Sequence, residues 1–470
     1  MASRLLKFSK IVSQPPAVRE ASARISDFEE ISDAFIQEKA AEQASRCSQC
    51  GIPFCQSHCP LGNHIPDWLQ LAAEGRTREA YEVSASTNPM PEVCGRVCPQ
   101  DKLCEGNCVV EKAGFGTVTI GAVERWLTDT AVREGWVRPV APERERPESV
   151  GIVGAGPAGM AAAERLRREG FKVTVYDRYD RAGGLMIYGI PNFKLDKSIP
   201  LRRHQALVEG GVEFRFGWEL GRDGSVASLR AEHDAVFLAI GAYAARRLDL
   251  PGETNMKPLA ALEFLTASNR KGLGDPVEGF EAGDLNARDK RVVVVGGGDT
   301  AMDCVRTAVR QGAKTVTCLY RRERETMPGS AREVKHAESE GVTFEWLSAP
   351  ARLADGKIEI QPMKLDMSGG GRGRVLPDDG PVWSLEADMV IEALGFSPED
   401  AAAMSGGASI HLTPRGTIEA DPKTLQTGEP GVYAAGDLVR GPSLVVWALK
   451  DAITASDAIV RHFAEIKEPA

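Results

Sequence analysis

Eight of the ten cysteines of this chain lie close together near its amino end. They form two sets with the spacings C-x2-C-x4-C-x3-C-P and C-x3-C-x5-C-x3-C: Cys47, Cys50, Cys55 and Cys59, and then Cys94, Cys98, Cys104 and Cys108. Structural zinc is usually bound by two separated pairs of ligands, whereas four thiols in one short loop before a proline are typical of ferredoxin clusters. The spacing therefore favours two [4Fe–4S] clusters over zinc, with ligands exchanged between the sets and Cys94 in the second cluster.

A glycine-rich motif follows a short β-branched run and opens a helix-like segment. It consists of Gly154, Ala155, Gly156, Pro157, Ala158 and Gly159. The next β-branched run ends in Asp177, 18 residues after the last glycine. In such a βαβ unit the glycines let the backbone approach a pyrophosphate at the helix N-terminus, and the acid accepts hydrogen bonds from ribose hydroxyls. The motif therefore predicts a dinucleotide site.

The same pattern recurs 142 residues later, with a different end to its second strand. The second motif consists of Gly296, Gly297, Gly298, Asp299, Thr300 and Ala301. Its second strand ends in Tyr320, Arg321 and Arg322 instead of an acid. An acid there would repel a 2′-phosphate, whereas guanidinium groups bind it, each charge-assisted contact contributing about 1.5–3 kcal/mol. The second site is therefore expected to bind NADP(H) in preference to NAD(H).

The carboxyl-terminal segment TGEPGVYAAGDLVRGPSLVVWA indicates a flavin at the first site. A strand over 431–435 ends in Gly436 and Asp437, and a helix is expected to begin near Ser443 and Val445. Asp437 is suited to bind a ribityl hydroxyl, and the following helix N-terminus can stabilise negative charge on a reduced flavin. The first dinucleotide is therefore expected to be FAD.

Length and composition set the frame for these sites. The 470 residues correspond to about three domains at roughly 150 residues each. A net charge of −9 argues against nucleic-acid binding, and no apolar run is long enough to span a membrane. The basic amino terminus lacks the apolar core of a secretory signal, so we expect a cytoplasmic protein whose clustered thiols are not disulfides.

Helix-like periodicity flanks the cysteines over 65–86 and 119–136 and predicts a helical shell around the clusters. His58 and His64 lie nearby and are interpreted as surface or supporting residues. The charged stretch at 138–149 is expected to be a linker to the first dinucleotide fold. Cys304 and Cys318, within the second fold, are expected to be ordinary buried thiols.

The motifs PFCxxxCPLxNxIPDW, GAGPAG, GGGDTAMDC, YRRERETMP and AAGDxxxGPSLVVWA together resemble the small (beta) subunits of bacterial NADPH-dependent glutamate synthases, over almost the whole chain. The same module occurs in dihydropyrimidine dehydrogenase. The resemblance implies an α/β fold with two Rossmann-like domains of glutathione-reductase type, the NADPH domain being inserted in the FAD domain. It also implies a helical iron–sulfur domain over 1–145, FAD-binding parts over 146–287 and 396–470, and an NADPH-binding domain over 288–395.

The resemblance also adds site residues. It implies that Gly184 and Leu185 lie near the flavin, and that Gly241 and Gly395 close the two nucleotide sites. In the family, a Glu or Gln on a helix after the last thiol completes the second cluster, and Glu124 fits that position. One cluster would then be held by Cys47, Cys50, Cys55 and Cys108, and the other by Cys59, Cys98, Cys104 and Glu124, which leaves Cys94 free.

The implied function is electron transfer from NADPH through FAD and the clusters, with no catalytic side chain. No amino-terminal cysteine nucleophile, H-E-x-x-H, G-x-S-x-G or phosphate-binding Walker loop is present. The resemblance implies a hetero-oligomer with a large (alpha) subunit that carries FMN and makes L-glutamate from L-glutamine and 2-oxoglutarate. The alternatives are a reductase subunit of another complex, of ferredoxin–NADP type, and a non-catalytic cluster-sensing subunit.

Overall fold

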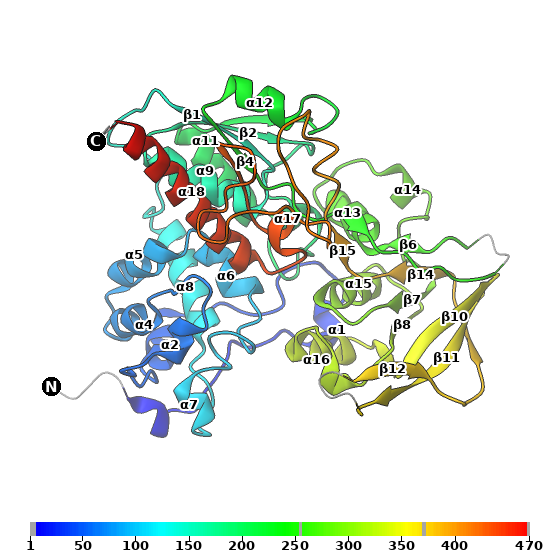
Figure 1. Cartoon of the computed structure of the whole chain (residues 1–470). Coiled ribbons are helices and arrows are strands. Elements are labelled where there is room, and N and C mark those ends of the chain that lie inside the picture. Colours follow the sequence, from blue (N-terminus) through cyan, green and yellow to red (C-terminus); the bar gives the residue numbers. More distant parts are fainter. Residues whose placement is uncertain (1–5, 253–255, 369–372, 468–470) are drawn as a thin grey trace.

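The computed structural model describes residues 6–252, 256–368 and 373–467, and its amino-terminal part is helical (Figure 1). The main helices here are α2 (Gln37–Ala44), α4 (Ile65–Ala73), α5 (Thr77–Thr87), α6 (Pro91–Val97) and α8 (Ile120–Arg133). Short turns η1 (Lys7–Ser9), α1 (Ala21–Arg24), α3 (Phe54–Ser57) and α7 (Val109–Lys112) connect them. Ile120, Val123 and Leu127 on α8 are spaced by three and four residues, so they form one apolar stripe that packs in a core with Trp68.

A five-stranded parallel sheet follows, in the order β16-β4-β1-β2-β3. Its strands are β1 (Ser149–Val153), β2 (Lys172–Asp177), β3 (Glu213–Phe216), β4 (Ala235–Leu238) and β16 (Val432–Ala434). The neighbouring helices are α9 (Pro157–Arg168), α10 (Leu185–Tyr188), α11 (Ser198–Glu209), α12 (Val226–Glu232), α17 (Asp437–Arg440) and α18 (Val445–Lys467). Because β16 returns to pair with β4, this sheet is assembled from two separate parts of the chain.

A second parallel sheet has the order β6-β14-β7-β8-β9. Its strands are β6 (Leu259–Ala260), β7 (Arg291–Val295), β8 (Thr315–Tyr320), β9 (Thr343–Trp346) and β14 (Met389–Glu392). Helices α13 (Ala261–Gly272), α14 (Glu278–Glu281), α15 (Asp299–Arg310) and α16 (Ala331–Ser339) and the turn η2 (Arg324–Thr326) accompany it. β6 lies within the range 146–287 expected for the FAD-binding part, yet it pairs with this second sheet.

An antiparallel sheet extends from the second domain (Figure 1). It contains β10 (Ser348–Ala354), β11 (Lys357–Asp366), β12 (Arg374–Pro377) and β13 (Trp383–Glu386). The outgoing and returning connections between the two parallel sheets pair with each other as β5 (Ala244–Ala245) and β15 (Phe396–Ser397). The α/β fold class, with two Rossmann-like domains that follow a helical domain in the sequence, is thus confirmed.

The helical part packs directly on the first sheet's domain. Arg203 on α11 donates to Glu92 on α6 at 2.7 Å and to Glu164 on α9 at 2.8 Å. Cys304 and Cys318 are fully buried in the second domain, as expected. In the described part of the chain, no helix combines the length and the apolar character needed to cross a membrane.

Candidate functional site

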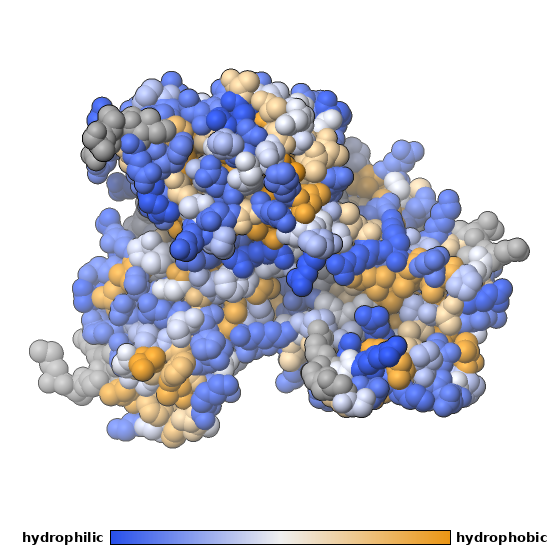
Figure 2. Space-filling view, in the orientation of Figure 1, coloured by the Kyte–Doolittle hydropathy of each residue, from blue (hydrophilic) through white to orange (hydrophobic). Residues whose placement is uncertain are grey.

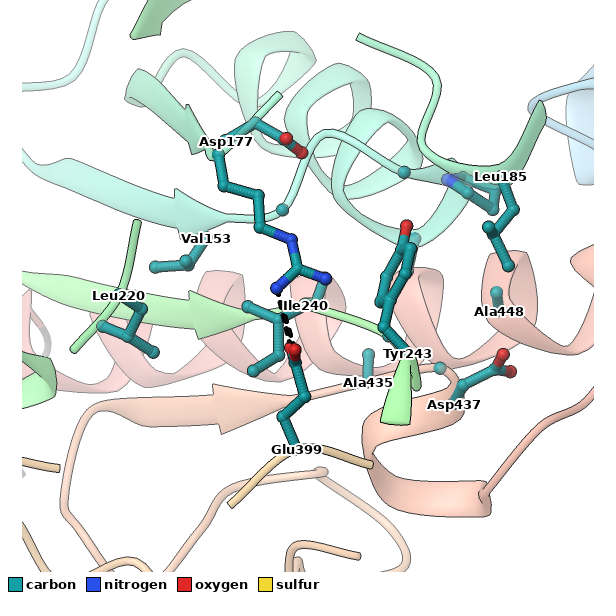
Figure 3. A pocket seen from close by; sticks show the side chains of 18 of the residues that line it. Val153, Asp177, Leu185, Leu220, Ile240, Tyr243, Glu399, Ala435, Asp437 and Ala448 are labelled. Atoms are coloured by element: carbon teal, nitrogen blue, oxygen red, sulfur yellow. Dashed lines mark hydrogen bonds and ion pairs between the residues drawn. The ribbon is translucent and has the colours of Figure 1, made fainter. Parts of the chain in front are cut away.

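A pocket opens at the carboxyl edge of the first sheet and spans about 980 Å³ including its mouth (Figure 3). Most of the residues expected at the FAD site line it: Gly154, Gly156, Pro157, Ala158, Asp177, Leu185, Gly241, Gly436, Asp437, Ser443 and Val445. Ala155, Gly159 and Gly184 support these residues from behind, and Ala155 accepts a hydrogen bond from the amide of Gly183 at 2.7 Å. Parallel strands present their carboxyl ends to a ligand, so the pocket lies where the fold predicts one.

The three motif glycines do different things in this pocket. A Cβ on Gly154, whose φ is +106°, would lie 2.3 Å from the carbonyl oxygen of Ala239. A Cβ on Gly159 would lie 1.8 Å from the oxygen of Gly154, so this glycine permits helix–strand packing. A Cβ on Gly156 would have no neighbour closer than the Cα of Gly184, 4.0 Å away. That open space over the start of α9 fits a pyrophosphate.

Asp177 lies at the end of β2 with only 8% of its surface exposed. Its carboxylate accepts hydrogen bonds from the amides of Ala155 at 2.6 Å and Tyr179 at 2.8 Å. Burial raises the pKa of Asp177, although these two amides act in the opposite direction. One bond to each oxygen orients the carboxylate and leaves acceptor capacity for ribose hydroxyls.

Asp437 lies at the other end of the pocket, at the start of α17. Its Oδ1 accepts a hydrogen bond from the amide of Ser443 at 3.0 Å. Burial raises the pKa of Asp437 to about 7, and the charge of Asp451 adds to this rise. A half-buried acceptor beside the N-terminus of α18 is the arrangement expected for binding the polar chain of a flavin.

Sequence reasoning missed an ion pair across this pocket. Arg178, next to Asp177, donates to both carboxylate oxygens of Glu399 at 2.9 and 3.0 Å (Figure 3). The Arg178 guanidinium also lies 4.5 Å from the ring centre of Tyr243. The position of Arg178 directly after Asp177, at the end of β2, is a signal from which the sequence could have predicted a role at this site. Glu399 carries no such signal, because it comes from the returning connection.

The second nucleotide motif forms an equivalent turn between β7 and α15. A Cβ on Gly296, whose φ is +152°, would lie 2.3 Å from the carbonyl oxygen of Ala393, and one on Gly297 would meet the ring of Tyr320. Gly298 has nothing within 4 Å of its Cβ position, and neither has Gly395. As at the first site, the backbone is open where a pyrophosphate would approach.

The residues around this turn differ in their burial and in their hydrogen-bond partners. Ala301 is buried, Thr300 is half-buried, and Asp299 accepts a hydrogen bond from the amide of Ser330 at 3.0 Å. At the end of β8, Arg321 is exposed and forms no ion pair with the described residues. Arg322 instead donates to the carbonyl of Gly373 at 2.9 Å. The two arginines therefore differ in their freedom to bind a phosphate.

The first set of thiols implied by the resemblance is brought together around one cavity. Cys47, Cys50, Cys55 and Cys108 line it. Burial raises the pKa of Cys47 to about 11 and that of Cys55 to about 12, and the neighbouring thiols of this group add to both shifts. Four thiols, two of them buried and two half-buried, fit an iron–sulfur cluster, which binds thiolates and removes this electrostatic cost.

The second set gathers in another part of the helical domain. Burial raises the pKa of Cys59 to about 11 and that of Cys104 well above its usual value, and Glu124 adds to both shifts. Cys98 is electrostatically coupled to these three groups as well. These groups act on one another's pKa, so they lie near one another, and Cys94 acts on the pKa of Cys59 in the same way.

Glu124 is an acid on the buried stripe of α8, 7% exposed. Its Oε1 accepts hydrogen bonds from Asn63, Ser84 and Asn88, at 3.3, 3.3 and 3.1 Å. In the described part of the chain, all side-chain hydrogen bonds to this carboxylate end on Oε1, so Oε2 is available to a metal. Burial raises the pKa of Glu124 to about 7.

Cys94 is buried beside this group, and its thiol is hydrogen-bonded to Asn88. Its Sγ donates to Oδ1 of Asn88 at 3.6 Å, and the neighbouring Cys98 and burial raise the pKa of its thiol well above the usual value. Among the described residues, no three His, Cys, Asp or Glu side chains converge on a point that would hold a single metal ion.

Two family models match the chain. Residues 24–136 match dihydropyrimidine dehydrogenase domain II, which carries a 4Fe-4S cluster, and residues 148–452 match the pyridine nucleotide-disulphide oxidoreductases. The fold and its sites thus define a pyridine-nucleotide-dependent flavin oxidoreductase with an iron–sulfur domain. The expectation of an oxidoreductase that uses FAD and NADPH is confirmed at this level.

Relatives give the more particular assignment. The glutamate synthase [NADPH] small chain of Azospirillum brasilense is 52% identical, with 97% of this chain and 96% of the relative covered. The small chain of Escherichia coli K12 is 42% identical, with 98% and 99% covered. The structure of Mycobacterium tuberculosis FprA in complex with NADPH shares the fold, with a TM-score of 0.57 and 20% identity over 68% of this chain and 86% of that one. This chain belongs to the family of glutamate synthase [NADPH] small chains, which confirms the resemblance of its motifs.

Proposed function

We propose that this chain is the electron-input subunit of a glutamate synthase. It would oxidise NADPH, and the electrons would pass by way of FAD and two [4Fe–4S] clusters to an FMN-containing large subunit. That subunit would make L-glutamate from L-glutamine and 2-oxoglutarate, and the complex would be cytoplasmic. The observation that carries the proposal is the presence in one chain of two open dinucleotide turns and two groups of clustered cysteines, the second of them beside Glu124.

The residues assigned to each cofactor follow from the geometry. The FAD would be held at its pyrophosphate by the open turn at Gly156, at its ribose by Asp177 and near its ribityl chain by Asp437. The NADPH would be held at its pyrophosphate by the open turn at Gly298 and at its 2′-phosphate by Arg321. FAD supplies the chemistry that joins a two-electron donor to one-electron acceptors. The chain's own residues bind and orient both nucleotides, so no side chain is needed as acid, base or nucleophile.

The two ligand groups have different surroundings, which supports an order of electron transfer. Cys94 and Cys98 belong to the apolar core that includes Met186, Leu195 and Ile199 of the FAD-side domain. Cys47 and Cys108 belong instead to the separate core of the helical domain. We therefore place the group containing Cys98 and Glu124 next to FAD, and the group containing Cys47 further along the path.

The group containing Cys47 also lies beside exposed apolar side chains. Ile52, Phe54, Val109 and Phe115 are 70%, 46%, 38% and 47% exposed, and Phe54 and Val109 line the same cavity as the four thiols. Figure 2 shows apolar residues gathered over the α7 region at the lower left of the molecule. Exposed apolar groups beside an electron-transfer site are suited to bind a partner protein. We propose that the large subunit binds this surface.

The proposal is tested by separating NADPH oxidation from glutamate synthesis. The isolated chain is expected to reduce an artificial dye with NADPH but to form no glutamate. Addition of the large subunit should restore NADPH-driven synthesis. Cys55→Ala should abolish synthesis while much of the dye reduction is retained, because hydride transfer to FAD does not use the clusters. Glutamate formation by this chain alone, or electron delivery only to an unrelated flavoprotein, would refute the assignment.

A further inference from the structure

The loop between Cys98 and Cys104 reaches across to the second dinucleotide domain. Lys102, on this loop, donates hydrogen bonds from its Nζ to the carbonyl oxygens of Pro328 at 2.5 Å and Gly329 at 3.1 Å. These are backbone acceptors 226 and 227 residues further along the chain. A single ammonium group therefore joins the loop that carries two proposed cluster ligands to a loop of the NADPH-side domain.

The loop that Lys102 holds lies directly against the second glycine turn. The amide of Gly329 donates to the carbonyl of Gly297 at 2.9 Å, and the amide of Ser330 donates to Oδ1 of Asp299 at 3.0 Å. A Cβ on Gly329 would lie 3.2 Å from the carbonyl oxygen of Gly297. The loop thus packs on the backbone that leads into α15, beside the open space at Gly298.

We infer that Lys102 is a positioning residue for nucleotide binding at the second site, supplied by the iron–sulfur domain. The inference rests on the proposed binding of NADPH at this turn. Lys102 acts on this loop in two ways, through its hydrogen bonds and through its charge. It satisfies two carbonyl groups that would otherwise turn towards solvent, which fixes the loop before the nucleotide arrives and lowers the entropic cost of binding. It also brings a positive charge to the side of the site that receives the pyrophosphate.

This role predicts that loss of Lys102 and loss of Arg321 affect NADPH and NADH binding differently. The pyrophosphate is common to NADPH and NADH, whereas the 2′-phosphate belongs to NADPH alone. Loss of Lys102 should therefore weaken both nucleotides by the same factor, and loss of Arg321 should weaken NADPH selectively. The lysine touches no reacting atom, so KM should change and kcat should not.

The experiment compares Lys102→Met with wild type in the full chain with its cofactors. We expect the Kd for NADP+ and the KM values for NADPH and NADH in dye reduction to rise about three- to ten-fold, consistent with the loss of one charge-assisted interaction acting indirectly. Hydrogen exchange of the backbone amides of Gly329 and Ser330 should become faster. Lys102→Arg should restore affinity, and Lys112→Met, which removes an exposed lysine of the same domain, should have no effect.

Two outcomes would overturn the inference. One is an unchanged NADP+ affinity in Lys102→Met when wild type binds NADP+, and the other is a selective loss for NADPH. If Lys102→Met loses iron or labile sulfide, the NADP+ affinities of Lys102→Gln and Lys102→Arg are compared instead. Weaker NADP+ binding in Lys102→Gln alone supports the role, and equal NADP+ binding in the two variants refutes it. Failure of wild type to bind NADP+ would instead refute the proposed function, and this inference with it.

Discussion

Arg24 and Glu340 form a buried ion pair between two segments that are far apart in the sequence. The Nε of Arg24 lies 2.8 Å from Oε1 of Glu340, and 316 residues separate them in the sequence. Glu340 also accepts hydrogen bonds from Arg306 and Arg310, so one carboxylate joins three guanidinium groups. Because Arg24 is on α1, Arg306 and Arg310 are on α15 and Glu340 directly follows α16, this pair joins the amino-terminal segment to the second domain (Figure 1).

Removal of Arg24 should destabilise this attachment. Arg24→Met is expected to lower the free energy of unfolding of the contacts between the segment and the second domain by about 1.5–3 kcal/mol, the typical contribution of a hydrogen bond to a charged group. Chemical denaturation and protease accessibility of the amino-terminal segment would measure it. Arg76→Met removes an ion pair whose side chains are 51% and 52% exposed, and should cost less than about 1 kcal/mol. Equal effects of the two substitutions would contradict the prediction.

The same cluster should make stability depend on pH in the acid range. Burial alone would raise the pKa of Glu340, but the hydrogen bonds from Arg310 and Arg306 outweigh it and lower the pKa to about 2. A folded-state pKa below the ordinary value of 4.5 contributes stability that is complete above pH 4.5 and is lost as the pH falls towards 2. Thermal unfolding between pH 6 and pH 3 should show this loss. Glu340→Gln should flatten that part of the profile, and an unaltered slope would show that other carboxyl groups cause it.

The two arginines after β8 should contribute unequally to nucleotide choice. Arg321→Ala should reduce kcat/KM for NADPH by about ten- to a hundred-fold with little change for NADH, because one charge-assisted contact to the 2′-phosphate is lost. Arg322→Ala should have a smaller effect, since Arg322 is bound to the carbonyl of Gly373. Dye-reduction kinetics with both nucleotides would decide. An equal loss for NADPH and NADH in Arg321→Ala would mean that this arginine only supports the fold.

The ion pair between Arg178 and Glu399 should retain FAD. It joins the end of β2 to the returning connection across the mouth of the pocket, with both side chains only about a quarter exposed. Glu399→Gln is expected to speed FAD release by about three- to ten-fold, the effect of a partly exposed ion pair. Flavin fluorescence after dilution would measure the release. A double-mutant cycle with Arg178→Met should show coupling, and strictly additive effects would argue against a shared role.

The second cluster should depend on Glu124 and not on Cys94. Glu124→Ala is expected to lower the iron and labile sulfide of anaerobically prepared protein by about half, the share of one of two [4Fe–4S] clusters. Cys94→Ala is the matched control and should retain both clusters, because Cys94 is hydrogen-bonded to Asn88. The opposite pattern would make Cys94 the ligand, as its spacing alone suggests. Stoichiometric zinc without sulfide would refute both assignments.

Local features of this protein could be predicted because the residues that produce them are neighbours in the chain. Gly154, Gly156 and Gly159 form one turn between a strand and the next helix, and their roles follow from backbone sterics alone. The same holds for the second turn at Gly296 and Gly298. The cysteine spacing likewise indicated iron–sulfur chemistry, since ligands within a short loop constrain the metal they can share.

Contacts between distant segments could not be predicted in this way. Periodicity places Glu124 on a helix, but only packing brings it to Cys59, Cys98 and Cys104. No local pattern pairs Arg178 with Glu399, Arg24 with Glu340, or Lys102 with the loop at Gly329. Side chains and backbone groups of these kinds find partners wherever folding brings them together. For the buried pair of Arg24 and Glu340 the pairing is also enforced, because an unpaired charge is costly where water cannot reach it.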